Sequence, residues 1–388
     1  MSEEGTGYDA ARIEVLEGRE AVRKRPGMWV GSTGERGLHQ LVFDVVGRAV
    51  NQVLARGGGS VAVTLTPDGG VRVTDDGTGG PFEAVGNTLG PDLEALLTGF
   101  PAGPEPSGRH IAEVGHLGGG LFVANALSSR LTAEVPSEGG RRIHEYARGV
   151  EVTPSATTGS ATGSGTTVAF WPDSEIFQTT RCSFAVLAER FRQVAFLNRG
   201  LGISLTDERP TGGEARAVSF RFPEGVRDFV AALHAETGAA VHPDVIGFER
   251  EDPRMAGAME VALLWCGSRE ERMRSFANSR ATHQGGTHVE GFRDGVAAAV
   301  TAYARAHGLP AAEPDPGADR ICRSLTAVVS VKLDRPEYLG ATRGLLGNTD
   351  VRGCVEEGVR EHLGDWFEEN PERAAEFVGR IVRGVQQD

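Results

Sequence analysis

An amphipathic helix with a polar stripe is the feature that most constrains what this chain of 388 residues can fold into. Between Leu38 and Val53, apolar side chains recur at three- and four-residue spacing, the pattern of a helix that buries one face. The opposite side carries Asp44, Gly47, Arg48, Asn51 and Gln52. Side chains four residues apart are neighbours on a helix, so Asp44 lies beside Arg48. Asp44 is therefore a candidate catalytic base, half of a solvated ion pair, or the remnant of a former site.

Two predicted strands follow this helix. Residues 60–66 and 70–75 alternate apolar and polar side chains on either side of the turn sequence PDGG, which predicts a β-hairpin. The hairpin ends in the sequence DDGTGGP at residues 75–81, and further along the chain GHLGGG at 115–120 leads into an apolar helix. A carboxylate at a strand end can accept from an amine such as that of adenine, and glycine amides at a helix N-terminus favour phosphate. Taken singly such glycines indicate only tight turns, but their order and spacing favour a nucleotide site.

The rest of the chain shows a change in composition about half-way along. Residues 154–165, PSATTGSATGSG, are of low complexity and predict a linker. The polar stretch 208–215 suggests a boundary between two domains, at 1–212 and 213–388. In the second half, the strand-like EVALLWCGS and SLTAVVSVKL flank the helical THVEGFRDGVAAAVTAYARAHG. This order of strand, long helix and strand suggests a crossover unit.

Composition excludes several classes of protein. The formal net charge of −13 argues against a chain that works mainly by binding nucleic acid. The four cysteines lie far apart with no CxxC pair, which favours reduced thiols over disulfides or zinc. The polar start MSEEGTGYDA does not resemble a signal peptide, and no stretch of eighteen apolar residues predicts a membrane span. We therefore expect a cytoplasmic protein.

Several longer motifs carry a resemblance to a known family. These are YDAARIEVLEGREAVRKRPGMWVGST, GTTVAFWP, FLNRGLGISL, GGTHVEGFR and AVVSVKL, which are spread over nearly the whole chain. The sequence resembles the amino-terminal ATPase region of the gyrase B subunit and of its topoisomerase IV relatives, within the GHKL ATPase superfamily. The resemblance implies an α+β fold: a Bergerat-type (GHKL) ATPase α/β sandwich, with an antiparallel-rich sheet and helices on one face, followed by a ribosomal-protein-S5-like transducer domain.

The resemblance also implies which residues bind a nucleotide. At the adenine end, Asp75, Gly77, Gly79 and Thr166 match the family. The phosphate loop corresponds to Gly115, His116, Leu117, Gly118, Gly119 and Gly120, and His110 stands where the family has a lid residue. Tyr8 matches the arm that crosses to the partner subunit in the family. The implied ligand is ATP or ADP, and the implied assembly is a homodimer whose closure depends on nucleotide.

Some positions depart from the family pattern. Asp44 stands in place of the glutamate base, Arg48 in place of the asparagine that holds magnesium, and Gly47 in place of an aspartate. Gln52 and Thr78 replace a glutamate and an arginine that pair in the family, and Arg343 replaces a lysine of the transducer loop. A guanidinium offers no oxygen to a metal, so we expect no metal ligand here and magnesium is disfavoured. The candidate catalytic residues are Asp44, Arg48 and Arg343.

Three functional hypotheses stay open. The first is a gyrase-B-like protein that binds an adenine nucleotide with impaired or altered hydrolysis and lacks the DNA-cleavage domain. The second is a repurposed GHKL-fold enzyme acting on a small molecule, with His110, His116, Asp44 and Arg48 in a changed pocket. The third is a functional ATPase fragment of a type II topoisomerase. In each case we expect no DNA cleavage and no strong DNA binding by this chain alone.

Overall fold

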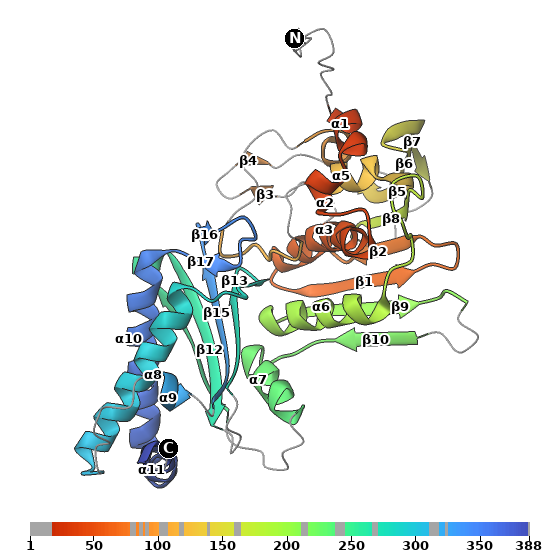
Figure 1. The fold of residues 1–388 in the computed structure, drawn as a ribbon. Coiled ribbons are helices and arrows are strands. Elements are labelled where there is room, and N and C mark those ends of the chain that lie inside the picture. Colours follow the sequence, from red (N-terminus) through yellow and green to blue (C-terminus); the bar gives the residue numbers. More distant parts are fainter. Residues whose placement is uncertain are drawn as a thin grey trace, which may run out of the picture.

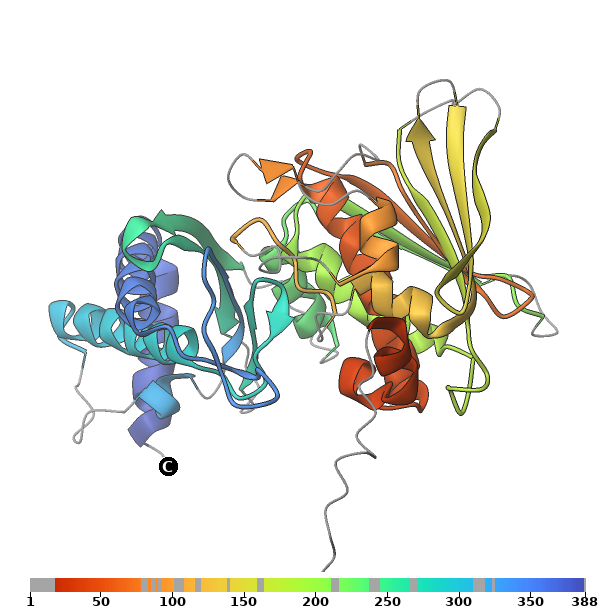
Figure 2. The same cartoon turned by 90° about the horizontal axis from the view of Figure 1, so that it is seen from above.

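The fold of the chain is shown in Figure 1 as a computed structural model. The structure describes all residues except 1–17, 78–82, 85–87, 90–92, 101–107, 116–119, 138–139, 159–163, 211–215, 237–244, 266–270, 310–317, 323–324 and 387–388. Figure 2 shows two lobes side by side, each built on a sheet of its own. We use "first lobe" for the elements from α1 to β10 and "second lobe" for those from α7 to α11.

The first lobe is organised around an eight-stranded sheet. Its strands are β1 (Gly59–Leu65), β2 (Val71–Asp75), β5 (Ser128–Ser137), β6 (Gly140–Ala147), β7 (Val150–Thr158), β8 (Thr167–Pro172), β9 (Leu201–Asp207) and β10 (Arg216–Phe220), in the order β10-β9-β1-β2-β8-β5-β6-β7. Every neighbouring pair is antiparallel except β1 and β9, which are parallel. Burial alternates along β1 and β9, as expected for a sheet with one covered face.

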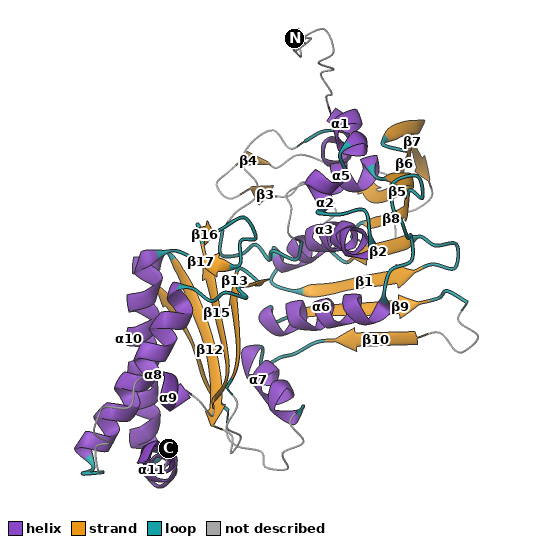
Figure 3. Ribbon diagram, viewed as in Figure 1, coloured by secondary structure: helices purple, strands orange, loops and turns teal. Residues whose placement is uncertain are grey.

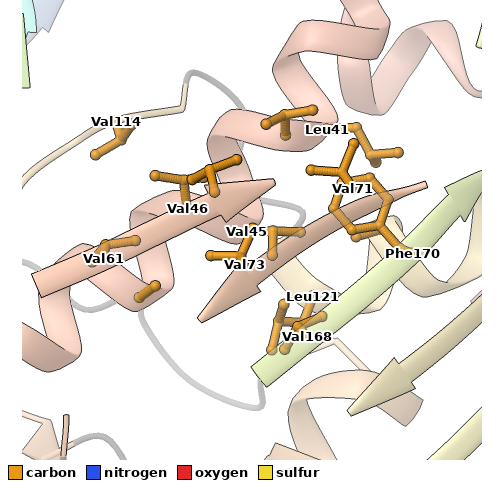
Figure 4. Close-up of a cluster of buried hydrophobic side chains, with 14 of the residues drawn as sticks. Leu41, Val45, Val46, Val61, Val71, Val73, Val114, Leu121, Val168 and Phe170 are labelled. Carbon is orange, nitrogen blue, oxygen red and sulfur yellow. The ribbon is translucent and has the colours of Figure 1, made fainter. Parts of the chain in front are cut away.

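Helices cover that face of the first sheet. They are α1 (Gly18–Lys24), α2 (Gly27–Val30), α3 (Glu35–Leu54), α4 (Leu93–Thr98), α5 (Gly120–Ala126) and α6 (Phe184–Leu197), and the short strands β3 (Glu83–Ala84) and β4 (Thr88–Leu89) form a separate pair. In Figure 4, Leu41, Val45 and Val46 of α3 lie against side chains of β1, β2 and β8. The predicted apolar stripe of this helix is therefore its core face, which leaves the polar stripe turned away from the core.

The second lobe is built on a five-stranded sheet whose central strands are buried on both faces. It contains β11 (Ile246–Asp252), β12 (Gly257–Trp265), β13 (Arg272–Ala277), β14 (Arg280–Ala281) and β15 (Leu325–Leu333), in the order β11-β12-β15-β13-β14. The other elements are α7 (Val226–Ala235), η2 (Pro253–Met255), α8 (Thr287–Ala306), α9 (Ala318–Ile321), β16 (Tyr338–Leu339), β17 (Leu345–Leu346), α10 (Thr349–Glu369) and α11 (Pro371–Gln386). Figure 3 shows α8 and α10 on one side of this sheet and α7 on the other. Burial on both faces explains why β12 and β15 are almost continuously apolar.

An aromatic stack joins the two lobes. The ring of Phe196, at the end of α6, stacks on Phe222 at 3.6 Å and on Phe229 of α7 at 4.6 Å between centroids. Phe276 and Val328 of the second sheet complete this apolar cluster. Helix α7 therefore packs against both the first lobe and the second sheet, and this packing fixes the orientation of the lobes relative to each other.

The structure confirms the α+β class and the hairpin, because β1 and β2 pair antiparallel. Two predictions are wrong. Residues 154–158 of the expected linker belong to strand β7, since their threonines and serine are compatible with an extended edge strand. The strand predicted to precede the long helix in the crossover, β12, pairs antiparallel with β15; the crossover runs instead from β13 through α8 to β15, and β13 and β15 are parallel. The boundary at 212 falls outside the described residues and stays a prediction, although β10 beyond it still pairs with β9.

None of the helices in the described part of the chain has the length and apolar character needed to cross a membrane.

Candidate functional site

The polar side of α3 is the floor of the candidate site. Asn51 binds the backbone of Ala112 twice: its Nδ2 donates to the carbonyl oxygen at 3.1 Å, and its Oδ1 accepts from the amide at 2.8 Å. Gly47 lies under Val114, whose Cβ is 3.4 Å from where a Cβ on residue 47 would be. That distance is an ordinary van der Waals contact, so residues 112–115 run close along this helix at Gly47.

The turn at residues 75–77, here the Asp75 turn, borders the other side of the floor. Asp75 is 4% exposed, and its Oδ1 accepts from the amides of Gly77 at 2.9 Å and Thr166 at 3.4 Å. Gly165, with φ of 115°, passes so close to Asp75 that a Cβ there would overlap the carbonyl oxygen. The Asp75 turn is therefore built within the first lobe, from the end of β2 and the residues preceding β8.

Arg48 lies next to the Asp75 turn. Its Nη1 is 3.9 Å from Asp75 Oδ2, and its side chain is only 11% exposed. The Nε atom is buried, and no described residue accepts a hydrogen bond from it. Helical spacing indicated Asp44 as a neighbour of Arg48, but the ion pair that the structure gives this arginine is with Asp75.

Burial and charge act in opposite directions on this pair. Burial lowers the pKa of Arg48, while the Asp75 carboxylate raises it. Burial raises the pKa of Asp75, and the Arg48 charge together with the amides of Gly77 and Thr166 opposes that rise. Desolvation is the larger influence on both groups, so burial disfavours the charged form of each.

Asp44 is oriented by its own helix and by a glycine. Its Oδ1 accepts a hydrogen bond from Gln40 Nε2 at 2.7 Å. A Cβ on Gly115 would overlap that same oxygen, so only glycine lets the backbone approach the carboxylate here. Gly115 is the first residue of the glycine-rich stretch 115–120, which places Asp44 beside the candidate phosphate loop.

The segment 108–115, which leads into this loop, is held by backbone-directed contacts from the second lobe. Glu113 donates its amide to the carbonyl oxygen of Asn278 at 2.7 Å, and Asn278 Nδ2 donates to the carbonyl oxygen of Gly108 at 3.1 Å. Arg190 of α6 donates to the carbonyl oxygens of Glu113 at 2.9 Å and Ser279 at 3.1 Å. Because it is buried, its pKa is lowered to about 10. Arg190 thus bridges the segment and the second lobe.

Side-chain ion pairs reinforce the same junction. Arg280 Nε lies 2.6 Å from Glu113 Oε2, and the hydroxyl of Tyr338 donates to Glu113 Oε1 at 3.1 Å. The guanidinium of Arg109 donates two hydrogen bonds to the Asp334 carboxylate, both at 2.9 Å, and the amide of Arg109 donates a third at 3.4 Å. The position of the candidate phosphate loop is therefore tied to the orientation of the second lobe.

The remaining predicted site residues fall into three groups. Tyr8, Gly79, His116, Leu117, Gly118 and Gly119 lie outside the described residues. Gly120, with φ of 53°, begins α5, and Thr166 is buried beside Asp75. His110 and Arg343 are exposed: the charge of His110 helps to lower the pKa of Asp334, and Arg343 lies in the turn between β16 and β17 with φ of 51°. The structure thus brings Asp44, Arg48, Asp75, Gly77, Gly115 and Thr166 together around one floor.

Sequence reasoning missed the residues that hold the pocket in shape. Asn51 lies on the predicted polar stripe, but its role as a backbone-binding residue was not predicted. A side-chain amide on this stripe could have indicated such a role. Gln40 is one turn before Asp44, so the spacing alone allowed this pair to be found. No sequence signal indicated Glu113, Arg280 or Tyr338, because their contacts join residues more than 160 positions apart.

Comparisons with known proteins bear on this arrangement. A sequence profile of DNA gyrase B matches residues 225–388. The DNA gyrase B protein of Streptomyces coelicolor is 44% identical over 97% of this chain, and the novobiocin-resistant DNA gyrase B protein of Streptomyces niveus is 41% identical over the same share. The alignments cover 57% and 58% of those two proteins. The chain thus spans less than two thirds of the length of these relatives.

The solved structures decide the family. The 43K ATPase domain of Thermus thermophilus gyrase B, in complex with an aminocoumarin, matches with a TM-score of 0.78 and 31% identity, over 96% of both chains. The chain belongs to the gyrase B family. A topoisomerase IV ATP-binding domain of Francisella tularensis, in complex with a small-molecule inhibitor, matches with a TM-score of 0.74 and 28% identity, over 96% of this chain and 98% of that one. Membership of the gyrase B family confirms the resemblance and the GHKL-type fold.

Proposed function

We propose that this chain is a gyrase-B-type module that binds ATP or ADP and hydrolyses ATP slowly or not at all. Support for nucleotide binding comes from Asp75. Its Oδ1 is held by two backbone amides, while Oδ2, which lies 3.9 Å from Arg48 Nη1, can accept from the exocyclic amine of adenine. The resemblance assigns this role to Asp75, and the buried position of its carboxylate fits that assignment.

The single observation that carries impaired hydrolysis is the position of Arg48. In the family an asparagine at this place holds magnesium, and here a buried guanidinium lies 3.9 Å from Asp75 Oδ2. Magnesium requires oxygen ligands in nearly octahedral geometry, whereas Arg48 offers only N–H donors. The residues present therefore do not fit the ion, and no step of the proposed function passes through it.

The position of Asp44 supports the same proposal. An aspartate is one methylene shorter than the glutamate base of the family, which withdraws its oxygens by about 1.5 Å. A misplacement of about 1 Å can cost on the order of 10²-fold in rate. In addition, Gln40 already donates to Asp44 Oδ1, and a hydrogen bond to the charged form makes a carboxylate a weaker base.

Calorimetry with ATP and ADP tests the binding part of the proposal. We expect binding to the wild type and at least a tenfold loss in Asp75→Ala, because one charge-assisted hydrogen bond contributes roughly 1.5–3 kcal/mol. The matched control is Asp76→Ala, which removes the neighbouring, exposed carboxylate that accepts from the amide of Ser60. Equal affinities of wild type and Asp75→Ala would refute the assignment of the base pocket.

A phosphate-release assay on the wild type tests the hydrolytic part. Turnover far below that of an intact relative measured in parallel supports the proposal. Brisk turnover that Asp44→Ala abolishes would instead identify a working ATPase fragment. Absence of both binding and turnover would favour the repurposed-enzyme hypothesis. The nucleotide-dependent homodimer and the lack of strong DNA binding stay predictions, and Tyr8, on which the dimer prediction depends, lies outside the described residues.

A further inference from the structure

Arg48 is a buried cation whose hydrogen-bonding capacity the described residues do not satisfy. Its Nε atom is buried and has no acceptor among them, and its Nη1 is 3.9 Å from Asp75 Oδ2, which is beyond hydrogen-bond distance. A guanidinium stays protonated in proteins, and a buried polar group without partners is unfavourable. A ligand that brings an anionic hydrogen-bond acceptor to Arg48 would therefore satisfy this guanidinium.

Asp75 supplies only part of the hydrogen-bond acceptors that Arg48 needs. Its Oδ1 is engaged by the amides of Gly77 and Thr166, so Oδ2 alone faces the guanidinium. In the proposed function the amine of adenine donates to this same oxygen. A bound base thus competes with Arg48 for Oδ2, and the guanidinium then needs another acceptor within the pocket.

The phosphates of a bound nucleotide are acceptors within reach of Arg48. Side chains four residues apart on a helix have Cβ atoms about 5–6 Å apart, which places Arg48 one turn from Asp44. Asp44 in turn lies against Gly115, where the candidate phosphate loop begins. An arginine side chain is long and flexible, and its planar guanidinium can bind two phosphate oxygens at once. It can turn from Asp75 to a phosphate without any change in α3.

We infer that Arg48 is the counter-cation of this site, so that the pocket binds the metal-free nucleotide and magnesium weakens binding. The inference rests on the proposed function, that the pocket binds ATP or ADP. Magnesium would occupy the phosphate oxygens that the guanidinium binds, and its charge would be repelled by Arg48. The residues of this site do not fit the magnesium ion that the family binds. In this inference the Arg48 guanidinium, a cation covalently attached to the chain, takes the place of that ion.

Isothermal titration of ATP in EDTA and in excess magnesium tests the inference. For the wild type we expect the affinity for ATP to be several-fold higher in EDTA. Arg48→Met keeps the apolar stem but removes the charge, and should lower the affinity for metal-free ATP by about 10- to 100-fold, the effect of a charge-assisted hydrogen bond. Arg48→Lys should restore part of it. Arg48→Asn, which introduces the family's residue, should bind ATP more tightly in magnesium than in EDTA.

Two controls separate charge from structure. Arg72→Met removes an arginine from the exposed side of β2 and should leave both affinities unchanged. Adenosine has no phosphate, so its affinity should be equal or higher in Arg48→Met than in the wild type.

Tighter binding of ATP to the wild type in magnesium would overturn the inference, and this measurement holds even if Arg48→Met does not fold. Equal affinity of the wild type and Arg48→Met for metal-free ATP would also overturn it. No binding of ATP to the wild type in either condition would instead refute the proposed function.

Discussion

The two borders of the candidate pocket are held in different ways. The Asp75 turn is held within the first lobe, by hydrogen bonds from Gly77 and Thr166 at the ends of two central strands of one sheet. The segment 108–115 runs along α3 but is held largely by the second lobe, where Arg280 lies 2.6 Å from Glu113. One border is therefore local, and the other depends on how the two lobes are oriented.

This difference indicates which border of the site would move if the orientation of the two lobes changed. A rotation of the second lobe would move the segment 108–115 and, with it, the start of the candidate phosphate loop at Gly115. It would leave Asp75 in place, because no contact of the second lobe holds that turn among the described residues. Such a rotation would therefore displace the candidate phosphate end of the site and leave the candidate base-binding end in place.

The largest expected effect is on the segment held from the second lobe. Arg280 is 5% exposed and its partner Glu113 21%, so Arg280→Ala leaves a largely buried carboxylate without its cation. Breaking a buried pair typically costs about 3–5 kcal/mol, and the partial exposure of Glu113 reduces this to roughly 2–4 kcal/mol. We expect amide hydrogen exchange in residues 108–115 to accelerate by about 10²-fold.

The Asp75 turn provides the comparison within the same experiment. Exchange at residues 71–77 should not change in Arg280→Ala, and Arg274→Ala, which removes an exposed arginine of β13, should affect neither border. Equal acceleration at both borders would contradict the distinction between them, since it would mean that the second lobe also holds the Asp75 turn.

The first border could be predicted from the sequence and the second could not. Asp75 follows an alternating strand and precedes glycines, so its place and its chemistry are indicated by a few adjacent residues. Likewise, the apolar spacing from Leu38 to Val53 correctly predicted the core face of α3. Glu113 and Arg280 show no such pattern. A glutamate in a loop and an arginine in a two-residue strand become partners only through the packing of two lobes, which no local signal records.

The position of Arg48 shows a second limit of sequence reasoning. Helical spacing correctly placed it beside Asp44 on one stripe, but spacing does not fix the direction of a long side chain. The carboxylate of Asp75, at the end of a neighbouring strand, attracts the guanidinium across the pocket. The chemistry of the residue was predictable, and its partner was not.

The next effect in size concerns the floor between the two borders. If hydrolysis is impaired only by residues of α3, the double change Asp44→Glu with Arg48→Asn should raise ATP turnover by about 10²-fold, because it restores both the reach of the base and an oxygen ligand. The gain in turnover of the double variant should exceed the product of the gains of the two single variants, since both residues act in one site. Steady-state phosphate release measures this. No gain in the double variant would mean that residues outside α3, such as Arg343 or those that hold the segment 108–115, limit the rate.

A smaller effect is expected in the pH dependence of base binding. Burial raises the pKa of Asp75, and the charge of Arg48 opposes the rise. In the proposed function Asp75 accepts from the adenine amine when ionised, so binding is expected to weaken as the pH falls through this raised pKa. Arg48→Met removes the opposing charge and lets the pKa rise further. Its affinity for adenosine should therefore begin to fall at a higher pH than in the wild type, which titration between pH 8 and pH 5 would reveal. Coincident pH profiles would show that Arg48 does not influence the Asp75 turn.

The smallest effect is expected for an ion pair of similar length that holds neither border. Arg352 of α10 lies 2.8 Å from Asp294 of α8, nearly as close as Arg280 to Glu113, but the two side chains are 53% and 36% exposed. Water screens such a pair, so it contributes little to the stability of the fold. Arg352→Ala should therefore leave the urea concentration at the midpoint of unfolding nearly unchanged, with no change in exchange at residues 108–115 or 71–77. Since the two pairs have almost the same geometry, a loss as large as that in Arg280→Ala would show that distance rather than burial decides their strength. The burial of the Arg280–Glu113 pair would then no longer support the conclusion that the second lobe holds the segment 108–115.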